Sequence, residues 1–100
     1  MPADVGAMLG QPWELSPSVA LRPEPFGALA YHFGNRRLTF LKRRDLVAVV
    51  RGLRSSPDVR TALTAAGVPT GQWDAYVKAL AGLADAGLIR PRLDPPKDAA

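Results

Sequence analysis

The sequence predicts an α+β domain in which a three-stranded antiparallel sheet is followed by three helices. In the first part of the chain, apolar residues alternate with polar or small ones, as they do in half-buried strands. After Lys42 the spacing of the apolar residues becomes helical. The chain has 100 residues, which is enough for one small domain by the usual prior of about 100–200 residues per domain.

Three extended runs are expected before the helices. The first covers residues 13–21 and is interrupted by proline, and the second covers residues 29–33. The Gly34-Asn35 pair separates the second run from the third, which begins at Arg36. Glycine adopts a positive φ without steric cost and asparagine tolerates it better than most residues, so this pair predicts a two-residue hairpin turn.

The first two helices have recognisable boundaries. The first is expected from about residue 44 or 45 to Leu53, because apolar residues there fall at i, i+3, i+4 and i+7. The second is expected to start at Ser56-Pro57-Asp58, with the serine as its N-cap, the proline at its first position and the aspartate in its first turn. Gly67 should end it.

The third helix is expected between Thr70, as its cap, and Gly87, with a broad apolar stripe along it. A short final strand is predicted within residues 88–93. The two ends, residues 1–12 and 91–100, are expected to be flexible tails on a domain of residues 13–90.

The composition argues against an enzyme. The chain has no cysteine and a single histidine, His32, which excludes thiolate catalysis and disulfides and disfavours a zinc or iron site. It carries neither a Gly-rich phosphate loop nor carboxylates paired on one helix face. Because no signal sequence or membrane helix is predicted, we expect a cytoplasmic protein without cofactor, metal or membrane contact.

Positive charge is concentrated in one part of the chain. Residues 36–60 hold eight cations and two anions, a net charge of +6, whereas the whole chain carries +4. A solvated face and the protection of a sheet edge would explain part of this charge. However, Arg43 and Arg44 lie at a helix start, where the helix dipole disfavours cations, so an anionic partner is expected nearby.

Nucleic acid is one candidate partner, because the second and third helices with the final strand resemble a helix-turn-helix with a wing. The expected third helix, however, holds Asp74 and Asp85 against Lys78, whereas a recognition helix normally offers cations and amides. We therefore expect no nucleic acid, and DNA binding by a winged helix-turn-helix is the alternative hypothesis.

A peptide partner agrees better with the positions of the prolines. The first strand region contains Pro17 and Pro23, which lack a backbone N–H and make its edge a poor template for another strand. The third strand has no proline. An extended acidic peptide is therefore expected to add beside it, to pair with backbone groups such as the N–H of Thr39, and to be attracted by the surrounding cations.

The stretch WELSPSVALRPEPFGALAYHFGNRRLTFLK at residues 13–42, followed by RDLVAVVRGL from Arg44, resembles the mycofactocin biosynthesis peptide chaperones. These chaperones belong to the RiPP recognition element superfamily, together with the pyrroloquinoline quinone peptide chaperone. The resemblance covers residues 13–89 and implies a winged-helix-like domain with a three-stranded sheet and three helices. It also implies a carrier protein without an active site of its own.

For function, the resemblance implies a peptide chaperone that binds the acidic leader of a precursor peptide by strand addition and presents it to a radical SAM maturase. The leader is expected along the third strand, in the groove against the third helix. The peptide-binding residues implied in this way are Arg37, Leu38, Thr39, Phe40, Leu41, Lys42 and Arg43 on the strand side, and Gln72, Trp73, Tyr76, Val77 and Leu80 on the helix side. An open strand edge also invites self-pairing, which is compatible with a homodimer.

Overall fold

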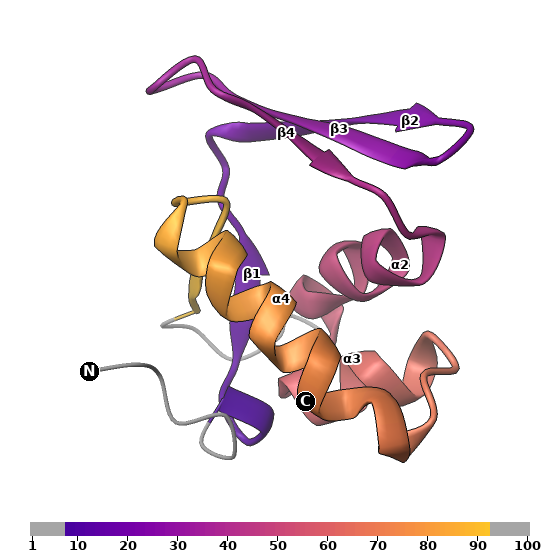
Figure 1. Cartoon of the computed structure of the whole chain (residues 1–100). Coiled ribbons are helices and arrows are strands. Elements are labelled where there is room, and N and C mark those ends of the chain that lie inside the picture. The colour runs from indigo at the N-terminus through magenta and orange to yellow at the C-terminus, as the bar shows by residue number, and fades with distance from the viewer. Residues whose placement is uncertain (1–7, 93–100) are drawn as a thin grey trace.

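The computed structural model describes residues 8–92, and its elements follow the predicted order of strands and then helices (Figure 1). The strands are β1 Trp13–Leu15, β2 Val19–Glu24, β3 Gly27–His32, β4 Leu38–Leu41 and β5 Ile89–Pro91. The helices are α2 Arg44–Gly52, α3 Val59–Ala65 and α4 Trp73–Asp85, with 3₁₀ turns η1 Leu53–Ser55 and η2 Thr70–Gln72. The predicted α+β class is confirmed.

The main sheet is antiparallel with the strand order β2-β3-β4, as predicted. In its register, Val19 lies opposite His32, and Leu41 lies opposite Ala28. The central strand is therefore β3, and β2 and β4 form the two edges. The sheet covers the helices as a separate layer, with α2 beneath it and α4 crossing in front in the view of Figure 1.

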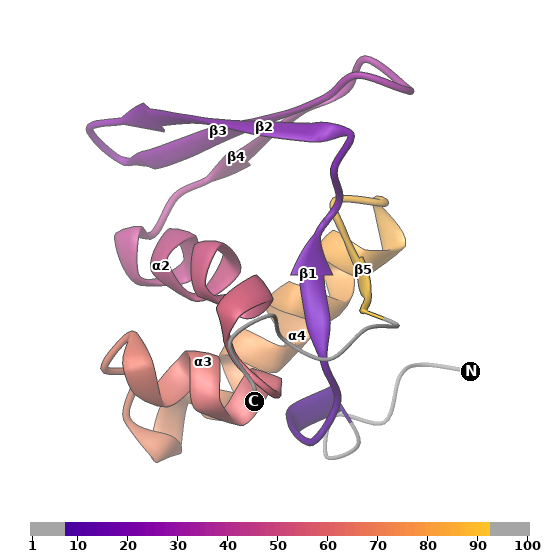
Figure 2. The ribbon, with the colours of Figure 1, turned by 180° about the vertical axis from the view of Figure 1, so that it is seen from behind.

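The first extended run forms two strands instead of one. β1 diverges from the sheet and pairs with β5 in a two-stranded antiparallel ribbon, in which Leu15 lies opposite Ile89 (Figure 2). Pro17 falls in the break between β1 and β2, where Val19 N donates to Ser16 O at 3.0 Å and closes a tight turn. Proline has no N–H to donate to a ladder, which explains why one continuous strand does not form.

The predicted β3–β4 hairpin is confirmed, but its turn is longer than the expected Gly34-Asn35 pair. His32 N donates to Arg37 O at 3.0 Å and Arg36 N donates to His32 O at 2.7 Å, so four residues form the loop. The positive φ falls on Arg36, at 61°. His32 Nδ1 accepts the N–H groups of Gly34 at 3.0 Å and Asn35 at 3.3 Å, and this side-chain capping stabilises the longer loop.

The N-cap of α3 is Asp58, which corrects the expected Ser56. The Asp58 carboxylate accepts the N–H of Thr61 at 2.8 Å and its hydroxyl at 2.7 Å, as an N-cap side chain does. Ser56 is buried two residues earlier, and its carbonyl accepts a guanidinium N–H of Arg92 at 2.8 Å. The helix therefore begins at Val59.

The α4 region begins differently from the prediction and ends as predicted. Thr70 opens the 3₁₀ turn η2 and makes no side-chain cap bond to α4, whose first residue is Trp73. Gly67 and Gly87 follow α3 and α4 with φ of 78° and 79°, which is the left-handed conformation that ends many helices.

The core lies between the inner face of the sheet and the three helices, and it includes residues expected in the tails. Met8 is only 1% exposed, and Gln11 O accepts the N–H of Val59 at 3.2 Å, so at least these two residues contact the rest of the domain. At the other end, Arg92 is buried. Residues 1–7 and 93–100 of the expected tails lie outside the described residues.

Candidate functional site

The strand β4 is an open edge of the main sheet, and the hydrogen bonds of the hairpin decide which backbone groups face outward. In an antiparallel pair of strands, hydrogen-bonded and non-hydrogen-bonded residue pairs alternate. Because His32 donates to Arg37, the pairs that Thr39 and Leu41 make with β3 are also hydrogen-bonded. The N–H of Thr39 therefore points at β3, not at the open edge as expected.

The backbone groups of Leu38 and Phe40 face the open edge, because these two residues lie between the hydrogen-bonded positions of β4. Their N–H and C=O groups have no neighbouring strand within residues 8–92. They form the template to which another strand can add.

The opposite edge of the sheet, β2, is less suited to strand addition, in agreement with the expectation from its prolines. Phe33 N donates to Ser18 O at 2.8 Å, so the same alternation places Pro23 at a position whose nitrogen faces away from β3. A proline there removes one donor from the β2 edge. Of the two edges, β4 offers the fuller set of backbone groups.

Arg43 connects the end of β4 to the helix layer. It occupies the N-cap position of α2 without a side-chain cap bond, and its guanidinium carbon lies 5.5 Å from the centroid of the Tyr76 ring on α4. This is a cation–π contact. The structure therefore brings these two predicted site residues together, but the tyrosine ring itself belongs to the core, with only 3% of Tyr76 exposed.

The other predicted helix residues have different positions. Val77 and Leu80 are fully buried core side chains, and Trp73 is half-buried with its Nε1 donating to Val68 O at 2.9 Å. These three residues pack α4 against the core, which leaves them little surface for a peptide. Gln72 is exposed at the end of η2.

Two α4 residues that the sequence analysis did not select lie on the flank next to Tyr76. At about 100° per residue, Ala79 and Leu83 project on the same side of the helix axis as Tyr76, and Lys78 projects on the other side. Ala79 is exposed, whereas Leu83 is buried. Their angular position around the helix axis relative to Tyr76 could have indicated from the sequence that they lie on the same side of α4 as Tyr76.

The cations near the β4 edge are available to an anionic partner. Arg37 and Lys42 are exposed at the two ends of β4. Within residues 8–92 the ion pairs are Arg22–Glu24 and Arg90–Glu14, so neither Arg37 nor Lys42 has a carboxylate partner there. The predicted strand residues therefore combine open backbone groups with positive charge that is not neutralised locally.

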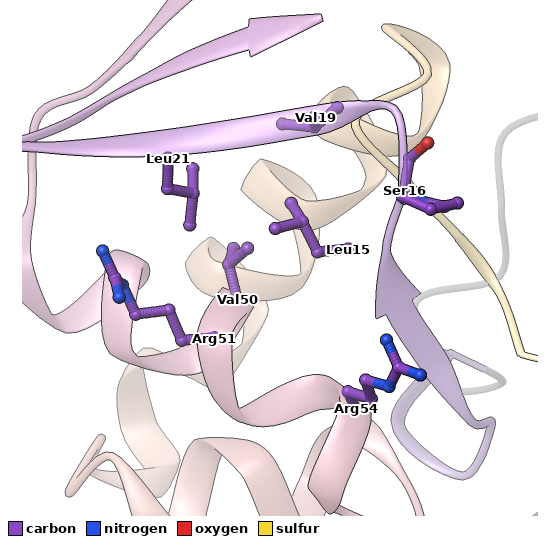
Figure 3. A pocket seen from close by; sticks show the side chains of 8 residues that line it. Leu15, Ser16, Val19, Leu21, Val50, Arg51 and Arg54 are labelled. Atoms are coloured by element: carbon purple, nitrogen blue, oxygen red, sulfur yellow. The ribbon is translucent and has the colours of Figure 1, made fainter.

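A pocket of about 420 Å³ lies at the opposite edge of the main sheet, between β2 and α2 (Figure 3). Leu15, Val19, Leu21 and Val50 give it apolar walls, and Arg51 and Arg54 contribute the charged part of its lining. The pocket adjoins the β2 edge, so it is separate from the backbone groups of β4.

Residues 8–92 contain neither a metal-ligating cluster nor a helix that could span a membrane. Within residues 8–92, no three metal-ligating side chains are grouped closely enough to hold an ion. Among the helices of the same range, none has the length and apolar character needed to cross a bilayer.

Comparison with known proteins identifies the family. The model of the peptide chaperone MftB family matches residues 12–90, which is nearly the whole described range and contains every candidate site residue. The chain belongs to the peptide chaperone MftB family. The resemblance to mycofactocin biosynthesis chaperones noted from the sequence is thereby confirmed.

Individual relatives of this family are close in sequence. The peptide chaperone MftB of Mycobacterium tuberculosis (strain ATCC 25618 / H37Rv) is 52% identical over 80 residues, which cover 80% of this chain and 73% of the relative. The protein of the same name from Mycolicibacterium smegmatis is 52% identical over 79 residues, covering 79% and 78%. No solved structure matches the chain. The relatives are peptide chaperones, which are not enzymes, in agreement with the expectation from the composition.

Proposed function

We propose that the protein binds the acidic leader of a precursor peptide as an added strand along β4 and presents that peptide to a radical SAM maturase. The single observation that carries the proposal is the β4 edge, where Leu38 and Phe40 direct their backbone N–H and C=O groups away from the sheet. Membership of the peptide chaperone MftB family supports the choice of a peptide as the partner.

The surroundings of the edge suit an acidic peptide. Backbone hydrogen bonds to β4 supply affinity that does not depend on sequence, and side-chain contacts supply specificity. On the helix side, an added strand would lie near the exposed Arg43, whose guanidinium carbon is 5.5 Å from the centroid of the buried Tyr76 ring. Arg37 and Lys42 contribute attraction for carboxylates, which accelerates association more than it raises affinity.

The direct test is a calorimetric titration of the full chain with the leader peptide and, separately, with duplex DNA of similar net charge. We expect saturable binding of the leader and no binding of DNA at physiological salt. If the leader fails to bind at both low and high salt, the chaperone proposal is wrong. If DNA binds and the leader does not, the winged helix-turn-helix alternative is favoured.

A proline substitution at the open edge of β4 tests whether the leader binds there. Phe40→Pro removes an outward N–H that the added strand would use, and we expect leader affinity to fall about tenfold, or ~1.4 kcal/mol, near the upper value for one net hydrogen bond. Phe40→Thr is the matched control, because it removes the same side chain and keeps the N–H. Phe40→Thr should therefore bind the leader about tenfold more tightly than Phe40→Pro does.

Thr39→Pro provides a second control for the direction of the hydrogen bonds. Because the N–H of Thr39 points at β3, this change should disrupt the sheet itself and lower the melting temperature in circular dichroism, whereas Phe40→Pro should remain folded. Equal leader affinity for Phe40→Pro and Phe40→Thr would argue against strand addition at β4.

A further inference from the structure

The face of the main sheet that points away from the helices is apolar over β3 and β4. Successive side chains of a strand alternate between faces, and the buried Ala28, Ala30 and Leu41 mark the inner one. The residues between them, which include Leu38 at 60% and Phe40 at 57% exposure, therefore project outward. No helix of the described residues covers this side in either view (Figures 1 and 2).

Aromatic residues at both hairpin turns extend this surface. The rings of Phe26 and Phe40 have centroids 5.8 Å apart, and those of Tyr31 and Phe33 are 5.3 Å apart in an edge-to-face arrangement. We call this surface the outer apolar face, and it consists of Phe26, Leu29, Tyr31, Phe33, Leu38 and Phe40.

The outer apolar face collects all the exposed large apolar side chains of residues 8–92. These are Phe26, Phe33, Leu38 and Phe40. Single apolar residues are common on protein surfaces, whereas a contiguous patch of this kind marks an interaction surface.

Cations surround the outer apolar face. Arg22 lies opposite Leu29 with an exposed side chain, and Arg44 donates to Pro25 O at 3.1 Å beside the first turn. The exposed Arg36 and Lys42 lie beyond the two ends of the β4 part. Of the nearby anions, Glu24 is paired with Arg22 at 3.0 Å, and Asp45 follows Arg44 in the first turn of α2.

An apolar face surrounded by cations indicates which kind of partner can bind it. Two copies of the chain joined through the face would oppose two rims of the same sign, which disfavours a homodimer there. The rings are packed edge-on or tilted against one another, so they do not present the series of open flat faces that single-stranded nucleic acids stack on. The complementary surface is a protein patch that is apolar at its centre and acidic at its rim.

We infer that the outer apolar face is the docking surface for the radical SAM maturase, which would present an apolar patch ringed by Asp and Glu. The inference rests on the proposed function and adds a second binding surface to it. A leader strand added to β4 would place alternate side chains on this same face, next to Leu38 and Phe40. The maturase would then contact chaperone and peptide together.

The test uses the full chain with Leu29→Thr and Tyr31→Thr combined, because both residues lie on the central strand β3 and leave the β4 edge intact. Threonine is β-branched and is favoured in strands, so the sheet should still form, which circular dichroism verifies. We expect affinity for the purified maturase of the same pathway to fall at least tenfold in surface plasmon resonance, and leader affinity to stay within twofold of the parent.

A charge-reversal pair tests the rim. Arg36→Glu should weaken maturase binding, whereas Arg60→Glu on α3, which makes the same change in net charge away from the face, should not. Equal effects of the two variants would contradict an acidic rim on the maturase.

Four results would separate the inference from its alternatives. If the parent and the Leu29→Thr/Tyr31→Thr variant bind the maturase equally, the inference is overturned and the proposed function stands. If the maturase binds neither protein while the leader binds both, presentation itself is contradicted. If the same variant loses binding to phosphatidylglycerol vesicles or oligouridine instead, the face belongs to a membrane or RNA. If light scattering shows a parent dimer that the variant dissolves, the face is a self-interface.

Discussion

Gly27 sets how closely the start of β3 approaches the end of β4. A Cβ atom at this position would overlap the carbonyl oxygen of Leu41 and would lie 3.3 Å from Arg43 N. The φ of Gly27 is +151°, which L side chains rarely adopt. The close approach holds the end of β4, and with it the backbone of Arg43, against the start of β3.

We predict that Gly27→Ala lowers the free energy of unfolding by more than about 1 kcal/mol, because the added methyl group has no room and the backbone conformation becomes strained. Gly82→Ala on α4 is the matched control, since a Cβ there meets open space. It should raise the free energy of unfolding by about 0.5–1 kcal/mol, the usual gain for alanine over glycine in a helix. Urea unfolding of both variants measures the difference, and a stable Gly27→Ala protein would contradict this role.

Individual residues also show why parts of the sequence-based prediction failed. Ser56 and Asp58 are equally good N-cap types, and the sequence alone favoured the serine because a proline follows it. The structure chooses Asp58 while the Ser56 carbonyl is bonded by Arg92, 36 positions away. A choice that depends on such a distant contact cannot be made from local spacing.

At the level of elements, the prolines correctly predicted which edge of the sheet offers the fuller set of backbone groups, but not which residues direct those groups outward. A two-residue turn at Gly34-Asn35 would keep the same register and exchange the hydrogen-bonded and non-hydrogen-bonded pairs, so that Thr39 would face the open edge. The four-residue loop capped by His32 reverses this assignment. Side-chain capping of a loop has no signature in the apolar pattern.

The helix side of the candidate site was predictable only in part. The apolar stripe of α4 identified Tyr76 together with Val77 and Leu80, and a stripe does not separate residues that contact a partner from residues that fill the core. The contact between Arg43 and Tyr76 supplies the missing orientation, because it shows which flank of α4 lies toward β4.

The cations around β4 should act mainly on the rate of leader association. We predict that Arg37→Glu combined with Arg43→Glu slows association severalfold at low ionic strength and much less at about 0.1 M salt, where charges are screened within ~10 Å. The control is Arg60→Glu combined with Lys78→Glu, which changes the net charge equally on other surfaces of α3 and α4. Stopped-flow measurements with a labelled leader compare them, and equal slowing by both pairs would show that only net charge matters.

At the scale of the whole molecule, Arg92 joins the two ends of the domain to the helices. Its guanidinium donates to the carbonyl oxygens of Trp13 at 3.2 Å, Leu53 at 2.7 Å, Arg54 at 3.1 Å and Ser56 at 2.8 Å. Composition assigned this residue to a proline-rich tail, because a single arginine there gives no sign that it is buried.

We predict that Arg92→Met lowers the free energy of unfolding by at least about 2 kcal/mol, because buried carbonyl groups lose their donors at a cost of about 1–3 kcal/mol each. Arg90→Met is the control, since Arg90 is exposed and its ion pair with Glu14 should contribute less than about 1 kcal/mol. Chemical denaturation gives both values. Similar losses for the two variants would mean that the Arg92 bonds add little to stability.

The pairing of β1 with β5 also determines how the domain responds to tension. Trp13 lies opposite Pro91, so a pull applied to the chain on either side of the domain acts on the same end of this ribbon. When two paired strands are pulled apart from one end, their hydrogen bonds carry the force one at a time and break in sequence. Arg92 lies just outside that first pair, where its N–H donates to Pro12 O at 3.0 Å and its guanidinium bridges to η1, so its bonds resist the opening of the ribbon. The β2-β3-β4 sheet, which offers the open edge, is a separate sheet from this ribbon.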